Sequence, residues 1–184
     1  MLTVLPDTNI LLSIRLLDLV MRSHAFGLFE VVWSDELVDE YRRKLIDVRG
    51  RTSEQAAAAA QRFMDAAHEG RIEPREYLHL IPGMLGKDSD DHVISAAARG
   101  GGVHVVLTGN ISDFPASDIG PGCEALTAAQ LFGRLAADFP QDLAAIVRLS
   151  SANLTRPPLS PEEILDRLAA VGLTEMATSV RPLL

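Results

Sequence analysis

The sequence lacks the features of disulfide-bonded, membrane and strongly basic proteins. Its single cysteine, Cys123, allows no disulfide within the chain and fits a reducing cytoplasm. No apolar run reaches the roughly 18 residues of a membrane span. No basic region precedes the first apolar stretch, so we expect neither a transmembrane helix nor a signal peptide. The net charge is −8, from 17 basic and 25 acidic residues. This charge argues against a surface that coats nucleic acid broadly, but not against a local basic groove.

Several catalytic patterns are missing as well. The tract 100–102 is all glycine but lacks the Lys-Ser/Thr that follows in a phosphate-binding loop. No Asp-x-Asp-x-Thr pattern follows the first apolar stretch, which argues against a phosphatase of that type. The histidines show no metal-ligand spacing, and we treat all five as structural or solvated; they are His24, His68, His79, His92 and His104.

The chain of 184 residues suits one domain with a small appendage. It reads as strands alternating with helices. Strands are expected at 2–6, 29–33, 75–81, 103–107 and 124–126. Helices are expected at 9–26, at 54–68, from 91 through 99, at 128–138 and at 161–171. A further helix is expected to begin after Ser34, which would cap it. The alternation predicts an α/β fold, with a mainly parallel sheet flanked by helices on both faces.

The last part of the chain changes character. We expect residues 1–139 to form the α/β domain and residues 140–184 to form a helical extension packed on it. Ser160, Pro161 and Glu163 make a capping box with proline at the first helical position. The helix that follows should turn an apolar stripe toward the protein and serve packing or partner binding rather than chemistry; its members are Ile164, Leu165 and Leu168.

Four acidic residues lie where a strand should end or a helix should begin: Asp7, Glu40, Asp91 and Asp113. In α/β sheets these positions lie at the edge where ligands bind. Converging carboxylates repel one another, so at least one should have a raised pKa when no metal is bound. A hard cation would relieve the repulsion, and oxygen ligands favour Mg²⁺ or Mn²⁺. The pattern therefore predicts a metal-dependent enzyme that acts on phosphates.

Two of these acids have close competitors. Glu40 could be solvated on its helix, or could pair with Lys44 four residues later. The other acids that could take its place are Glu36 and Asp39. At the later helix start, one of three aspartates must be the cap; they are Asp88, Asp90 and Asp91. We take Asp91 as the metal acid because His92 and Val93 follow it.

Four segments resemble the motifs of PIN-domain ribonucleases, in the family's order. They are Leu5-Pro6-Asp7-Thr8-Asn9, Trp33 to Glu40 (WSDELVDE), Asp88 to Ala97 (DSDDHVISAA) and Thr108 to Pro115 (TGNISDFP). Each segment alone is a weak signal, but their order, spacing and expected local structure agree over about residues 2–135. Within the family the chain looks like VapC-type toxins, and its tail looks like the helical extension of one VapC subgroup.

The resemblance implies a PIN-like three-layer fold and a Mg²⁺- or Mn²⁺-dependent endoribonuclease. The acids carried over as catalytic and metal-binding residues are Asp7, Glu40, Asp91 and Asp113. Asn9, Thr108 and Asn110 would orient a water or a carboxylate. The family often has Asp at the position of Asn110, whereas here the acid falls at Asp113. Which of these two is nearer the metal stays open.

The resemblance also implies an RNA substrate and the toxin role in a toxin–antitoxin pair. The antitoxin's C-terminal segment would cover the site, and the toxin could form a homodimer. Arg15 is a candidate phosphate contact, and the basic residues concentrate in one stretch: Arg15, Arg42, Arg43, Lys44, Arg49 and Arg51. The alternatives are another Mg²⁺-dependent phosphate hydrolase and a non-catalytic PIN-like binding module. Retention of all four acids argues against the binding module.

Overall fold

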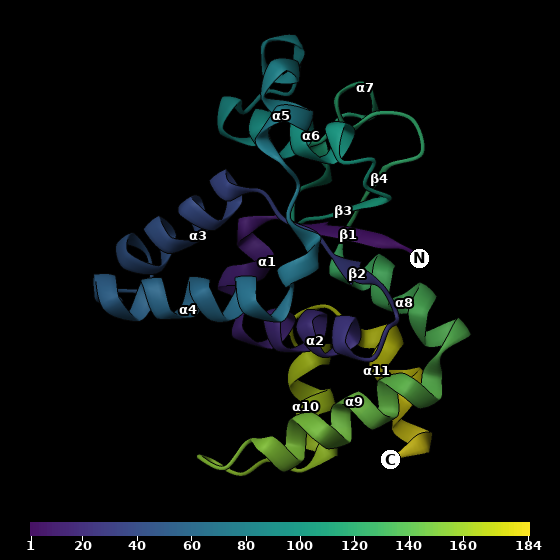
Figure 1. Ribbon diagram of the computed structural model, residues 1–184. Coiled ribbons are helices and arrows are strands. Elements are labelled where there is room, and N and C mark those ends of the chain that lie inside the picture. Colours follow the sequence, from purple (N-terminus) through teal and green to yellow (C-terminus); the bar gives the residue numbers. More distant parts are fainter. The chain divides into compact units, whose positions relative to one another are not determined.

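The computed structural model describes residues 1–184 and is an α/β structure with a four-stranded, all-parallel sheet (Figure 1). The strand order is β2-β1-β3-β4. The strands are β1 (Thr3–Pro6), β2 (Glu30–Val31), β3 (Val105–Leu107) and β4 (Glu124–Leu126). The predicted fold class is confirmed, and the sheet places the first strand between the second and the third.

The two central strands are short and, apart from Thr3 at the start of β1, apolar. Val4, Leu5 and Val106 are fully buried, as expected for a parallel sheet that is covered on both faces. Pro6 pairs with Leu107 in the register of β1 and β3, so Asp7 and Thr108 both follow directly at the carboxyl edge of the sheet.

The chain packs as two compact units, and the first comprises residues 1–13 and 29–126. It holds the sheet and six α-helices, with four short 3₁₀ helices between them. The α-helices are α1 (Thr8–Leu12), α3 (Asp35–Asp47), α4 (Ser53–Ala66), α5 (Pro74–Tyr77), α6 (His92–Gly100) and α7 (Ala116–Ile119). The 3₁₀ helices are η1 (His68–Gly70), η2 (Leu78–Gly83), η3 (Ser89–Asp91) and η4 (Ile111–Asp113).

The second unit comprises residues 14–28 and 127–184 and is entirely helical. Its elements are α2 (Ile14–Ala25), α8 (Ala128–Asp138), α9 (Pro140–Asn153), α10 (Pro161–Ala169), α11 (Thr174–Val180) and η5 (Arg181–Leu183). Helix α11 packs on α8, and α10 packs on α9 and α11. This compact unit takes in α2 and α8 as well as the residues after 139. The domain boundary expected after residue 139 stays a prediction.

The predicted cap of α10 is confirmed. The Ser160 side chain accepts a hydrogen bond from the Glu163 amide at 3.2 Å, and the Glu163 carboxylate accepts one from the Ser160 amide at 2.7 Å. Leu165 and Leu168 are buried, while Ile164 is partly exposed. The apolar stripe therefore packs within the helical unit. No helix in the structure is both long enough and apolar enough to cross a membrane.

Three local predictions were wrong. Residues 75–81 form α5 and η2 rather than a strand, because Pro74 and a capping box between Glu73 and Glu76 start a helix there. The helix expected at 9–26 breaks at Ser13, whose backbone is extended, into α1 and α2. The strand expected at 29–33 shortens to β2, since Trp33 bridges to Arg71 instead.

Candidate active site

Asp7 lies at the carboxyl end of β1 and is 6% exposed. It occupies the N-cap position of α1, but its carboxylate makes no capping hydrogen bond. Instead the carboxylate accepts hydrogen bonds from the Thr108 hydroxyl at 2.8 Å and from the Asn9 amide. The carboxylate is therefore held by side chains from α1 and from the loop after β3 rather than by a helix cap.

The loop after β3 is tied to the same carboxylate. Thr108 is fully buried, and its hydroxyl accepts a hydrogen bond from the Asn110 amide at 3.0 Å. The Asn9 side-chain oxygen accepts from the Gly109 amide at 3.0 Å. Asp7, Asn9, Thr108 and Asn110 thus form one network, which is why two segments about 100 residues apart share one geometry.

Burial is the main reason that the pKa of Asp7 is raised, and the nearby Glu40 raises it further. The hydrogen bonds from Thr108 and the Thr8 amide and the charge of Lys44 lower the pKa but do not cancel the burial. The metal-free site therefore disfavours the ionised form of this carboxyl.

Glu40 lies on α3, which begins at Asp35. Ser34 is the N-cap of this helix, and its side chain accepts a hydrogen bond from the Leu37 amide at 3.3 Å. One carboxylate oxygen of Glu40 accepts from the Thr8 hydroxyl at 2.6 Å, and the other pairs with the Lys44 ammonium at 2.6 Å. Glu40 therefore makes the ion pair that the i,i+4 spacing allows, and it also faces the residue after Asp7.

The competing acids on α3 have other partners. Asp39 is exposed and pairs with Arg42 at 3.1 Å. Glu36 accepts a hydrogen bond from the Tyr77 hydroxyl. Among the acids of α3, only Glu40 is linked by hydrogen bonding to the Asp7 segment.

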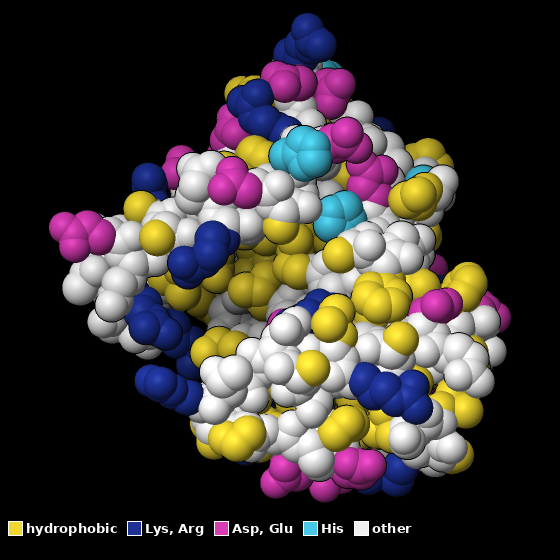
Figure 2. Space-filling view, turned by 60° about the horizontal axis from the view of Figure 1, so that its bottom comes forward, with side chains coloured by type: hydrophobic (Ala, Val, Ile, Leu, Met, Phe, Trp, Pro, Cys, Tyr) yellow, Lys and Arg dark blue, Asp and Glu magenta, His cyan; other side chains and the backbone are white.

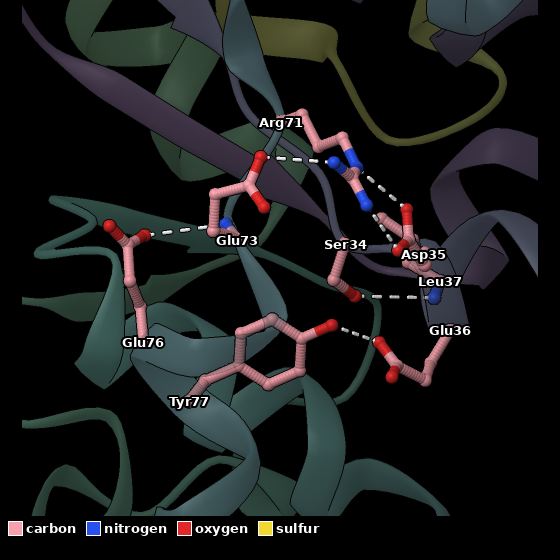
Figure 3. A network of polar contacts seen from close by, with 8 residues as sticks. All are labelled: Ser34, Asp35, Glu36, Leu37, Arg71, Glu73, Glu76 and Tyr77. Atoms are coloured by element: carbon pink, nitrogen blue, oxygen red, sulfur yellow. Dashed lines mark hydrogen bonds and ion pairs between the residues drawn. The ribbon is translucent and has the colours of Figure 1, made fainter.

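A polar network fixes the start of α3 (Figure 3). The Arg71 guanidinium bridges the Asp35 carboxylate, at 2.7 and 2.9 Å, and the Glu73 carboxylate at 2.9 Å. Hydrogen bonding by Arg71 lowers the pKa of Asp35. Burial and Glu36 together raise the pKa of Tyr77. Sequence reasoning missed this network because it joins α3 to residues 71–77, which are distant in the chain and whose end was wrongly predicted as a strand.

Asp91 occupies the N-cap position of α6 without capping it. Asp88 instead caps η3, the turn before α6: its carboxylate accepts a hydrogen bond from the Asp90 amide at 3.0 Å. The pKa of Asp91 is raised to about 7, first by burial and then by the negative charges of nearby acids. These acids, in order of effect, are Asp7, Asp88, Asp113 and Glu40. The structure therefore brings the four sequence-predicted acids into one electrostatic neighbourhood.

Asp113 ends η4, after β3, and its carboxylate accepts a hydrogen bond from the Asn110 side-chain amide. The Asn110 side-chain oxygen in turn accepts from the Ser112 hydroxyl at 2.8 Å. Asn110 thus positions Asp113, and Asp113 is the one of the two whose charge acts on Asp91. Which of them would lie nearer a metal stays a prediction.

Comparison with protein families agrees with the geometry of this edge. The family model described as PIN domain matches residues 3–112, which contain the ends of β1, β2 and β3 and three of the four acids. The chain belongs to the PIN-domain family. A second model, described as VapC50 C-terminal domain, matches residues 126–182. A comparison with curated proteins found no match.

The two matches identify a VapC-like PIN protein with a C-terminal extension. PIN domains are generally nucleases, so the matches support a nuclease toxin in general. The PIN match ends at residue 112, one residue before Asp113. The place of Asp113 in the site therefore rests on its contact with Asn110 and its effect on Asp91.

The first compact unit, residues 1–13 and 29–126 and here called the PIN unit, also contains an aspartate that sequence reasoning missed. Asp118 is 2% exposed, and its carboxylate accepts hydrogen bonds from the Leu85 and Gly86 amides at 2.6 and 2.8 Å. Burial alone would raise the pKa of Asp118, but these hydrogen bonds outweigh it, so the pKa is lowered. The His92 ring contacts the Gly86 carbonyl at 2.8 Å. Together these contacts hold the loop that leads to Asp91.

Arg15 belongs to a different compact unit from the four acids. It lies exposed on α2, which belongs to the helical unit, whereas the acids belong to the PIN unit. Its role as a phosphate contact stays a prediction.

Proposed function

We propose that the protein is a Mg²⁺- or Mn²⁺-dependent endoribonuclease and the toxin of a toxin–antitoxin pair. The observation that carries the proposal is the buried carboxylate of Asp7 at the end of β1, held by Thr108 and Asn9, with Glu40 bonded to the adjacent Thr8. The raised pKa of Asp91, caused by burial and by the charges of nearby acids, supports it. Acids that come together against their own repulsion are typical of sites that bind cations or tune proton transfer. The PIN and VapC matches give the class of reaction.

The chemistry of the four acids fits a hard divalent cation. All of their donor atoms are carboxylate oxygens, which Mg²⁺ and Mn²⁺ prefer. In the arrangement seen, no three His, Cys, Asp or Glu side chains come close enough together to hold an ion. Binding therefore requires small side-chain movements, and we propose Asp7, Asp91 and Asp113 as ligands together with Glu40.

Neighbouring residues fix the orientation of two of these acids, Asp7 and Glu40. Thr108 and Asn9 fix the Asp7 carboxylate, so its orientation is set before a ligand arrives. Thr8 and Lys44 do the same for Glu40, and Lys44 partly compensates the negative charge. Polarisation of the scissile phosphate and a lowered pKa of the attacking water are what the metal supplies when bound.

The partners follow from the family and are proposed with the function. We propose RNA as the substrate and a cognate antitoxin as the inhibitor, with both proteins in the cytoplasm and the toxin able to form a homodimer. The VapC50 C-terminal match covers most of the helical unit. This unit contributes none of the four acids, so we propose that it serves assembly rather than chemistry.

Cleavage of a defined, end-labelled RNA tests the proposal. We expect cleavage with Mg²⁺ or Mn²⁺, none in EDTA, and none with Asp7→Asn in either metal. Asp65→Asn is the matched control, because Asp65 is an exposed aspartate on α4 whose carboxylate only accepts from Gln61. Cleavage that persists in EDTA, or that survives Asp7→Asn at the parental rate, would rule out this metal site.

A further inference from the structure

A hollow of about 570 Å³ opens beside Glu40 in the PIN unit. Its wall comes from α3 and from the segment that begins α6, and Glu40 is the only proposed catalytic residue in it. Small-molecule sites in proteins typically measure about 300–1,000 Å³. The hollow is thus large enough for a nucleotide and shares a wall with the acidic site.

The lining includes one cation that has no partner. Arg42 is paired with Asp39, whereas Arg43 is exposed and forms no ion pair. Figure 2 shows a group of Lys and Arg side chains at the left of the view, where α3 and α4 lie in Figure 1. A planar guanidinium next to a nuclease centre suits a phosphate of the substrate backbone.

The remaining lining combines apolar surface with free acceptors. Ile46 and Val93 are partly buried and offer an apolar surface. One oxygen of Glu36 accepts from Tyr77, which fixes the side chain, and the other has no hydrogen-bond partner. A nucleobase has matching parts, since its faces are apolar and its edge carries hydrogen-bonding groups.

We propose that this hollow is a nucleotide subsite next to the scissile phosphate and that Glu36 makes it selective for guanine. Arg43 holds a phosphate of that nucleotide, and Ile46 and Val93 contact the base. Guanine presents two adjacent N–H donors on its pairing edge, which a carboxylate can accept together. Uracil flanks its single N–H with two carbonyl oxygens, which a carboxylate repels. The inference rests on the proposed ribonuclease function and adds its substrate preference.

A basic peptide of a protein partner is the competing occupant, because Glu36 and Asp90 could accept from an arginine. The four lining carboxylates would attract such a peptide, but the unpaired Arg43 in the same wall offers a partner to a phosphate and none to a basic peptide. The shared wall with Glu40 also places the hollow where substrate must pass. The nucleotide is therefore the occupant that these observations favour.

The test uses the full-length protein with Mg²⁺ and a set of RNAs that differ by one base on either side of the cleaved bond. At one of these positions we expect guanine to exceed uracil in kcat/KM by about 5-fold or more, as one good bidentate contact allows. Glu36→Gln should bring this ratio close to one while cleavage of the uracil substrate continues. Glutamine can still accept from Tyr77, so the fold is kept. Glu54→Gln is the matched control, because Glu54 is an exposed glutamate on α4, and it should keep the preference.

Arg43→Ala should raise KM about 5-fold for all four bases and weaken the salt dependence of KM, since a phosphate contact carries no base information. Arg62→Ala is the control: it removes the same charge from an exposed position on α4 and should change KM little. A wild-type enzyme without base preference, or a preference that survives Glu36→Gln, overturns the subsite. Loss of a protein partner by Glu36→Gln, with base preference unchanged, overturns it in favour of a peptide site. Absence of cleavage of every RNA would instead overturn the proposed function.

Discussion

The carboxyl of Asp7 is more buried than that of any other acid of the candidate site, and its surroundings disfavour its ionised form. Burial and Glu40 both raise its pKa, while Thr108 and Asn9 hold its orientation. A side chain that only capped α1 would make a capping hydrogen bond to that helix, which Asp7 lacks; its carboxylate accepts from the Thr8 amide and from the Thr108 and Asn9 side chains instead. Function and stability should therefore respond to its substitution in opposite directions.

For Asp7→Asn we expect RNA cleavage to fall about 100-fold or more, because a neutral amide oxygen is a poor ligand for a hard cation. Thermal stability in EDTA should be unchanged or higher, since a buried charge and its repulsion by Glu40 are removed. Paired melts in EDTA and in Mg²⁺ measure the second effect. An earlier melt in EDTA would show that Asp7 is structural.

Asp91 should make the metal-free protein sensitive to pH. Its pKa is about 7 in the folded state and 3.8 as the unperturbed value, so the unfolded chain loses this proton first. Ionisation thus costs the folded state stability as the pH rises through about 4 to 7, and the loss is complete above about 7. At pH 8 Asp91→Asn should be more stable in EDTA than the parent by about 1 kcal/mol, or about 2–4 °C, after allowance for partial exposure. The two melting curves should converge toward pH 4, and a constant gap between pH 4 and pH 8 would contradict this assignment.

At the scale of elements, the site depends on how α3 begins. Ser34 caps the helix, and Arg71 and Tyr77 tie Asp35 and Glu36 to the segment around α5 (Figure 3). Glu40 follows one turn after Glu36 on the same helix. The rotation of α3 that presents Glu40 to Thr8 is therefore set by contacts outside the helix.

Tyr77→Phe should lower the free energy of unfolding by about 1 kcal/mol, because one hydrogen bond to Glu36 is lost and the buried ring is kept. Tyr41→Phe is the matched control: Tyr41 is also buried, on α3, and its hydroxyl makes no hydrogen bond to another residue. Urea denaturation of both variants compares the losses. Equal losses would mean that the Tyr77 hydroxyl does not stabilise the start of α3.

At the scale of the whole molecule, the candidate site and the helical packing fall in different units. The four acids belong to the PIN unit, while α2 and α8 to α11 form the second unit with its own apolar core. Leu165 is fully buried in that core. A defect there should change stability and leave the catalytic side chains intact.

We expect Leu165→Ala to destabilise the protein by about 2–5 kcal/mol, because it leaves a cavity in a packed core. Below its melting temperature the variant should cleave RNA at a rate per folded molecule within about 2-fold of the parent. Val171→Ala, at a position 36% exposed, should cost much less. Loss of cleavage in folded Leu165→Ala would show that the helical unit takes part in the reaction.

Local pattern was enough to predict the strands at 2–6 and 103–107, the capped helix after Ser160 and the placement of Asp7 at a strand end. These features depend on neighbours within a few residues, and the chain alone specifies them. The helix break at Ser13 and the helix at Pro74 were missed. The break at Ser13 was missed because the apolar periodicity continues from α1 into α2. The helix at Pro74 was missed because a weak alternation of apolar residues was given more weight than the capping signal.

Only the tertiary structure decided which acids act on one another and how strongly. The Thr108–Asp7 hydrogen bond joins residues 101 positions apart, and the Tyr77–Glu36 bond joins residues 41 apart. The raised pKa of Asp91 depends first on burial, which no sequence spacing reveals. The sequence by itself determined the candidate residues of the site and their order. Packing determined their distances, their desolvation and the partners that hold them, because these quantities depend on chain segments that meet only in the folded state.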